Sequence, residues 1–255
     1  MDRTCARAVE LGLGAVAFTE HADFTPVTAG ARLDVAGYLE CLAGCRTRFP
    51  GLAIWSGVEL GEPHRFAEAA AAVLRQGNFD LVLGSLHCIE SQGQMVDCSA
   101  LASDPELDPA SVMRNYFEEM LGLLAASVEF QVLAHLEYPK RYWPAGHPDY
   151  RPQDYRAEIE AVREEAARRG MALELNTTRG MDEARGLCPG PEVVRWWRQA
   201  GGRAVALGSD AHQPETLGAG LAVAREVAVS AGFKTGSLLY ASGPRSPLAG
   251  LLTPW

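Results

Sequence analysis

The chain has 255 residues, of which 47% are hydrophobic and 22% are charged, a composition typical of a globular protein with a substantial core. Its formal charge of −9 argues against binding to nucleic acid or to an anionic membrane through bulk electrostatics. We expect neither a membrane span nor a signal peptide, because no long apolar run and no basic-then-apolar leader is present. The six cysteines form no Cys-x-x-Cys pair, which predicts reduced thiols and a cytoplasmic protein.

Helical patterns and short apolar runs alternate along the chain. In the first helical pattern, Cys5, Ala8, Val9 and Gly12 form one stripe. Helices are predicted at residues 3–14, 66–77, 111–126, 153–169, 192–199 and 215–230. Apolar runs that predict strands lie at residues 15–18, 53–60, 80–87, 130–138, 171–178 and 203–212.

This alternation predicts βα units and a parallel sheet of six strands. An open dinucleotide-binding sheet is one possibility, but no Gly-x-Gly-x-x-Gly loop follows the first run, so the pattern favours a barrel or near-barrel. Since no linker divides the pattern, we expect a single domain over residues 1–255. Its last part, from about residue 232 to 255, is rich in Gly and Pro and is predicted to be an irregular tail.

Polar side chains, nearly all of them ionisable, follow the predicted strands at the point where each strand ends. These strand-end residues are Glu20, His21, Glu59, His87, His135, Glu174, Asn176, Asp210 and His212. The carboxyl ends of parallel strands meet at one face of a barrel, so we expect these side chains to converge on one cavity. A single histidine at such a position is most often structural, but four of the six histidines lie there.

Imidazole and carboxylate groups together are typical ligands of Zn, Mn or Fe. A centre of two such metals suits phosphate-ester hydrolysis, because the ions bind the ester oxygens and lower the pKa of a bridging water. A serine nucleophile is less favoured, since Ser85 and Ser209 lie near histidines but in no Gly-x-Ser-x-Gly turn. His64 and His147 fall outside the strand ends, and we expect both to be surface residues.

Six segments together resemble the PHP (polymerase and histidinol phosphatase) superfamily, and most of all its histidinol-phosphate phosphatase branch. They span residues 14–218 and read GAVAFTEHADF, SGVEL, LVLGSLHCIE, VLAHLEYPKRY, ALELNTT and VALGSDAHQPETLG. The resemblance implies a distorted (β/α)7 TIM-like barrel, a centre of three divalent metals and hydrolysis of small anionic phosphate monoesters. Histidinol phosphate is the substrate that this branch implies.

The resemblance also implies roles for individual residues. Glu59 would bridge the first and second metals, His87 and His135 would complete the second, and Asp210 would bind the first. His21 and His212 would bind the third metal. Glu59, Asp210 and His212 are therefore the expected catalytic residues. Arg179 is the leading candidate to hold the phosphate, with Lys140 and Arg141 as further candidates, because a cation suits phosphate oxygens.

The sequence departs from the family pattern at its start. The family begins with a strand that ends in His-x-His, whereas no histidine precedes His21 here and the first predicted element is a helix. Either the recorded start lies too late or the truncation is real and the activity is impaired. We favour the first, because every other ligand position is filled. With only Glu59, His87 and His135 forming a complete set, we expect about one tightly held metal in this chain.

The leading hypothesis is thus a metal-dependent phosphatase of the histidinol-phosphate type. One alternative is another PHP phosphoesterase that acts on nucleotides or sugar phosphates. A second alternative is a truncated module that binds metal without turnover.

Overall fold

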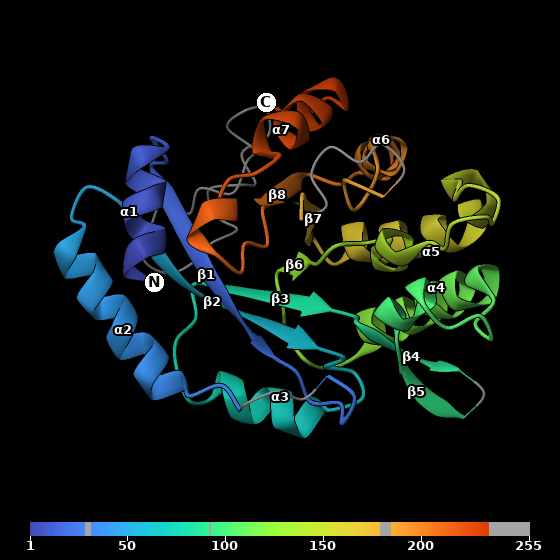
Figure 1. Cartoon of the computed structure of the whole chain (residues 1–255), viewed down its shortest axis with the longest axis horizontal. Coiled ribbons are helices and arrows are strands. Elements are labelled where there is room, and N and C mark those ends of the chain that lie inside the picture. Colours follow the sequence, from blue (N-terminus) through green and yellow to red (C-terminus); the bar gives the residue numbers. More distant parts are fainter. Residues whose placement is uncertain (29–31, 92, 179–184, 235–255) are drawn as a thin grey trace.

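The computed structural model describes residues 1–28, 32–91, 93–178 and 185–234. Six parallel strands form one curled sheet in the order β1-β2-β3-β6-β7-β8 (Figure 1). Their bounds are β1 Ala15–Ala22, β2 Ala53–Gly61, β3 Leu81–Ser85, β6 Val132–Leu133, β7 Ala172–Asn176 and β8 Ala204–Gly208. All six predicted strands are therefore confirmed, and the sheet runs in chain order.

Helices surround the curled sheet on its outer side (Figure 1). They are α1 Asp2–Glu10, α2 Val35–Arg48, α3 Ala67–Leu74, α4 Pro109–Ala125, α5 Arg156–Arg168, α6 Pro191–Gln199 and α7 Leu221–Ser230. In the described residues, short 3-10 helices lie between them: η1 Cys98–Ala102, η2 Tyr138–Tyr142, η3 Pro152–Tyr155 and η4 Pro214–Thr216. A small antiparallel hairpin of β4 (Cys88–Ser91) and β5 (Gln94–Asp97) projects beside α4 (Figure 1).

The longest helix, α4, shows how the sequence builds the main core. Asp108 caps its first turn by accepting a hydrogen bond from the Ser111 backbone N–H at 2.9 Å, and Pro109 occupies the first helical position. The apolar residues at helical spacing in its sequence are Met113, Phe117, Met120, Leu121 and Leu124, and all of them are fully buried except Leu121, which is partly buried. They pack in one apolar cluster with residues of α5, α6 and the sheet.

Helix α2 fastens the first two strands together. The Tyr38 hydroxyl donates a hydrogen bond to the Phe18 carbonyl and accepts one from the Gly57 N–H, both at 2.7 Å. Glycine at position 57 allows β1 and β2 to approach closely, because a Cβ there would lie 2.6 Å from the Thr19 side chain and 2.9 Å from the Phe18 carbonyl oxygen. The fixed pairing of β1 with β2 sets His21 directly beside Glu59.

The sheet ends at β1 on one side and at β8 on the other, and within the described residues these two strands do not pair. A cavity of about 1040 Å³ lies between them and is lined by residues of both strands, including Val16, Phe18 and Leu207. Helix α1 and η4 approach each other across the same side, where Arg3 forms an ion pair with Glu215 at 2.6 Å. The cavity runs from this region to the carboxyl ends of the strands.

Several details differ from the sequence expectations. Helix α2 and the β4–β5 hairpin were not predicted. The run at 130–138 contributes only the two residues of β6, because the chain bends at His135 and Glu137, where φ is 24° and 74°. Val9 is 55% exposed rather than part of the buried stripe, and the last predicted helix begins at Leu221. In the described part of the chain, no helix has the length and apolarity to cross a bilayer.

Candidate metal centre

The predicted ligands converge at the carboxyl ends of the parallel strands. His21 and Glu59 lie near the ends of β1 and β2 and are direct partners in the parallel ladder. Paired residues of neighbouring strands point to the same face of a sheet, so the two side chains meet. His87, His135 and Asp210 each follow the end of a strand, as expected from the sequence.

Glu59 is the centre of the first ligand group. Its side chain is buried, and its Oε1 lies 2.8 Å from Nε2 of His135 and 3.2 Å from Nε2 of His87. His21 joins this group, since ligand atoms of His21, Glu59 and His87 all lie within 4.8 Å of one another. Three imidazoles around one carboxylate are a donor set that a divalent transition metal accepts.

A second ligand group consists of His21, Asp210 and His212, whose ligand atoms also lie within 4.8 Å of one another. The His212 side chain is 68% exposed, and its Nδ1 lies 3.0 Å from the Asp210 carbonyl oxygen. Because a carbonyl only accepts, Nδ1 carries the proton and Nε2 keeps its lone pair in the neutral ring. His21 belongs to both groups, so the two form one continuous centre.

Asp210 is held by polar neighbours from β7 and the loop after it. Its Oδ2 accepts hydrogen bonds from Asn176 Nδ2 at 3.2 Å and from Thr178 Oγ1 at 2.8 Å. Its backbone has a φ of 48°, in the left-handed region. Asn176 was identified as a strand-end residue, whereas Thr178 was not singled out.

Residues with positive φ other than glycine gather around this centre. In the described residues they are Glu62, His135, Glu137 and Asp210. Each lies within four residues after the end of a sheet strand, and two of them are candidate ligands. Backbone conformations of this kind cost energy and persist where surrounding contacts enforce them, which is common at functional sites.

The three candidate phosphate-binding residues differ in their contacts. Arg141 is buried, its guanidinium lies 5.0 Å from the centre of the Tyr138 ring, and its Nη1 is 3.5 Å from Oδ2 of Asp210. Its Nε and Nη2 have no hydrogen-bond partner among the described residues. Lys140 is instead paired with buried Glu137 at 3.0 Å. Arg179 lies outside the described residues.

Burial and close charges set the protonation of the buried acids. Burial alone would raise the pKa of Glu59, but hydrogen bonds with His135 and His87 outweigh it and hold the pKa well below its usual range. Burial, together with the charges of Glu59 and Asp210, raises the pKa of Glu174 to about 8.

Two acidic residues near the ligands were not identified from the sequence. Asp23 lies between His21 and His87, and Glu62 accepts hydrogen bonds from the backbone N–H groups of His87 and Cys88 at 2.5 and 2.8 Å. Asp23 follows His21 by two residues, a spacing that could have revealed it. Glu62 lies just after β2. For this strand end, the sequence analysis had identified only Glu59.

The two remaining histidines, His64 and His147, were both predicted to be surface residues, and the structure confirms this for one of them. His147 is exposed, as predicted. His64 is not a surface residue: its side chain is only 12% exposed, and Nε2 lies 3.0 Å from Oε2 of Glu119 on α4. The prediction failed because the sequence did not reveal that Glu119 of α4 contacts the segment just before α3. All six cysteines are free, as expected.

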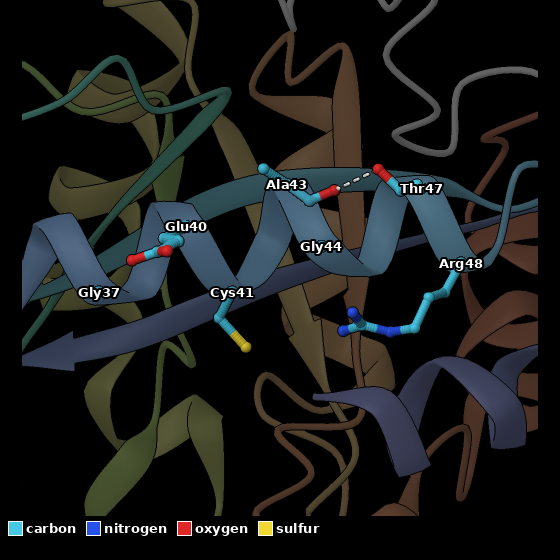
Figure 2. Close-up of a pocket in the computed structure, with 7 residues that line it drawn as sticks. All are labelled: Gly37, Glu40, Cys41, Ala43, Gly44, Thr47 and Arg48. Atoms are coloured by element: carbon cyan, nitrogen blue, oxygen red, sulfur yellow. Dashed lines mark hydrogen bonds between the residues drawn. The ribbon is translucent and has the colours of Figure 1, made fainter.

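A second hollow, of about 620 Å³, lies on α2 away from the ligand groups (Figure 2). It is lined by Gly37, Glu40, Cys41, Ala43, Gly44, Thr47 and Arg48. Figure 2 shows the Thr47 hydroxyl donating to the Ala43 carbonyl, a bond of 3.1 Å within the helix. Neither candidate ligand group lies there, so the metal-binding chemistry belongs to the strand ends.

A curled parallel sheet with imidazole and carboxylate ligands at its strand ends defines the class: a metal-binding α/β protein of the distorted TIM-barrel kind. The model of the PHP domain family matches residues 1–178, and the chain belongs to that family. The fold and family expected from the sequence are thus confirmed.

The chain is similar to proteins named histidinol-phosphatases. It is 26% identical over 222 residues to a probable histidinol-phosphatase of Clostridium acetobutylicum, with 86% of this chain and 83% of the relative covered. A probable histidinol-phosphatase of Deinococcus radiodurans is 28% identical over 216 residues, with 83% and 79% covered. These relationships and the PHP fold support a metal-dependent phosphatase.

A solved structure has the same fold. It is the histidinol phosphate phosphatase of Lactococcus lactis in complex with zinc, L-histidinol and phosphate. The two structures agree with a TM-score of 0.78 at 21% identity, over 91% of this chain and 87% of the other.

Proposed function

We propose that this chain is a metal-dependent phosphomonoester hydrolase and that histidinol phosphate is its substrate. The observation that carries the proposal is the pair of ligand groups joined through His21 at the carboxyl ends of the strands. Further support comes from relatives named histidinol-phosphatases and from the Lactococcus lactis structure, which holds zinc, L-histidinol and phosphate.

The donor chemistry of the site fits a divalent metal. Glu59, His87 and His135 supply one carboxylate and two imidazoles from three buried positions, and they would hold the tightest ion. His21, Asp210 and His212 would hold a weaker one, since His212 is largely exposed. We therefore propose about one tightly held metal. When bound, such an ion polarises phosphate oxygens and lowers the pKa of a bound water.

We assign the remaining roles to residues around this centre. Glu59 and Asp210 would hold the ions, and exposed His212 faces the side from which a substrate enters. Arg141 would hold the phosphate, because its guanidinium approaches Asp210 through Nη1 while Nε and Nη2 have no hydrogen-bond partner among the described residues. Lys140 is a weaker candidate owing to its pairing with Glu137. Arg179 stays a candidate from the sequence alone.

A panel of phosphate monoesters tests the substrate. Phosphate release from histidinol phosphate, a nucleoside monophosphate and a sugar phosphate would be measured with added zinc or manganese. We expect the highest kcat/KM for histidinol phosphate. Faster release from another ester would indicate a different phosphoesterase. Metal binding without release from any ester would indicate a module that does not turn over.

A single domain over residues 1–255, a cytoplasmic location and the lack of a nucleic-acid partner stay predictions from the sequence.

A further inference from the structure

The carboxylate of Asp23 lies between two imidazoles that come from different strands. Its Oδ2 is 3.4 Å from Nδ1 of His21, and its Oδ1 is 3.2 Å from Nδ1 of His87. The two rings lie close together, with centroids 5.4 Å apart. The side chain of Asp23 is 16% exposed, so its contacts with the rings are partly shielded from water.

These contacts determine which nitrogen of each ring would face a bound metal. An ionised carboxylate only accepts hydrogen bonds, so Nδ1 of each ring faces Asp23 as a donor. Nε2 is the other ring nitrogen, and in His87 it lies 3.2 Å from Oε1 of Glu59, with which it would share the metal. A carboxylate that accepts from the far nitrogen of a metal-binding histidine fixes both the tautomer and the ring orientation.

We propose that Asp23 is a positioning residue that orients His21 and His87 together, so that Nε2 of each ring points to the metal. This inference rests on the proposed metal-dependent function. One carboxylate thereby couples the two ligand groups, because His21 belongs to both and His87 to the first.

Two neighbouring features support this role. Gly61 lies against Asp23, and a Cβ at Gly61 would overlap Oδ1 of Asp23, so the lack of a side chain at Gly61 makes room for the carboxylate. Glu62 separately fixes the backbone of His87 through the N–H groups of His87 and Cys88. Because the backbone of His87 is fixed in this way, its ring can change position only by rotating about its side-chain bonds, and the contact with Asp23 restricts that rotation.

Zinc affinity of the full chain tests the proposal directly. Asp23→Asn keeps the size of the side chain but loses the charge and one acceptor oxygen, and Gly61→Ala displaces the carboxylate without removing it. Asp149→Asn, at an exposed position, is the control for loss of one negative charge. We expect zinc affinity, measured by competition with a chelator, to fall about 10–100-fold in both test variants and to stay unchanged in the control.

The protonation of the two rings provides a measurement that a merely structural role would not change. Long-range ¹H–¹⁵N spectra at saturating zinc identify the protonated nitrogen of each histidine. We expect Nδ1–H for His21 and His87 in the wild type, and a mixture of tautomers in folded Asp23→Asn. Wild-type affinity and wild-type tautomers in that variant would overturn the role of Asp23. A wild-type chain that binds no zinc would overturn the proposed function itself.

Discussion

Glu59 is the residue on which the first ligand group depends most, because its Oε1 contacts both His87 and His135. We predict that Glu59→Gln abolishes phosphate release, since an amide lacks the charge that holds a cation between the rings. The variant should stay folded by circular dichroism. Glu129→Gln, which changes an exposed acid, serves as the control. Turnover like that of the wild type in folded Glu59→Gln would contradict the assigned role.

Arg141 tests how the phosphate is held. Arg141→Lys keeps the positive charge but loses the planar fork that can donate two parallel hydrogen bonds to phosphate. We predict a higher KM for the phosphate ester, corresponding to a loss on the order of 1.5–3 kcal/mol, with the larger effect on KM rather than kcat. Arg151→Lys, at an exposed ion pair with Asp154, is the matched control. An unchanged KM would remove Arg141 from the substrate site.

At the scale of residues, the strand-end rule located the ligands because it needs only the order of apolar runs and polar residues. It brought together His21 and Glu59, which are partners in the ladder. It could not find Thr178 or Glu62, because their contacts depend on how the chain bends after each strand. His64 is largely buried because it packs against α4, and a contact between segments so far apart in the chain cannot be predicted from the residues around His64.

At the scale of elements, the pairing of β1 with β2 controls the metal centre. Gly57→Ala would place a Cβ 2.6 Å from Thr19 and 2.9 Å from the Phe18 oxygen, forcing the strands apart. We predict a loss of roughly 1–3 kcal/mol in the free energy of unfolding, together with weaker zinc binding. Gly51→Ala, where a Cβ would meet open space, should change neither. Equal thermal stability of the two variants would show that the close approach is not limiting.

Glu119 ties α4 to the start of α3 and to the hairpin. It forms an ion pair with Arg65 and a hydrogen bond with Nε2 of His64, and it accepts a hydrogen bond from the Glu90 N–H at 3.0 Å. Burial alone would raise the pKa of Glu119, but the hydrogen bonds from His64 and Arg65 outweigh it and lower the pKa to about 2.

A folded pKa below the usual 4.5 means that Glu119 stabilises the fold above about pH 4.5 and loses this contribution as the pH falls towards 2. We predict that Glu119→Gln lowers the free energy of unfolding at pH 7 by about 2 kcal/mol, and that the difference from wild type shrinks below pH 4.5. Glu118→Gln, the exposed neighbour, provides the control. Denaturant titrations at pH 7 and pH 3 measure both, and a difference independent of pH would contradict the ion pairing.

The elements themselves were predictable where the pattern was strong. The helical spacing of Met113, Phe117, Met120, Leu121 and Leu124 predicted the buried face of α4, with Leu121 only partly buried at its margin. Helix α2 was missed although Val35, Tyr38, Leu42 and Cys45 are buried at helical spacing, because Gly37 and Gly44 lower its intrinsic propensity. The hairpin was missed because its two strands have only four residues each, and it forms no part of the parallel sheet.

At the scale of the whole molecule, the curled sheet brings candidate ligands from five strands to its carboxyl end, and those from β1, β2 and β8 line one cavity. The first predicted strand pairs with the second, and the order then follows the chain, so the sequence indicated the topology correctly. The link between the two ligand groups could not be predicted in the same way, because it depends on distances across the sheet. Those distances join both ligand groups through His21.

The most direct test of the central claim is phosphate release from histidinol phosphate before and after metal removal. The full chain would be treated with a chelator, dialysed and then reloaded with zinc or manganese, with bound metal and released phosphate measured on the same samples. We predict that release disappears with the metal and returns with it, and that about one metal per chain is tightly bound in the active protein. Undiminished release from a chain shown to be free of metal would contradict the account.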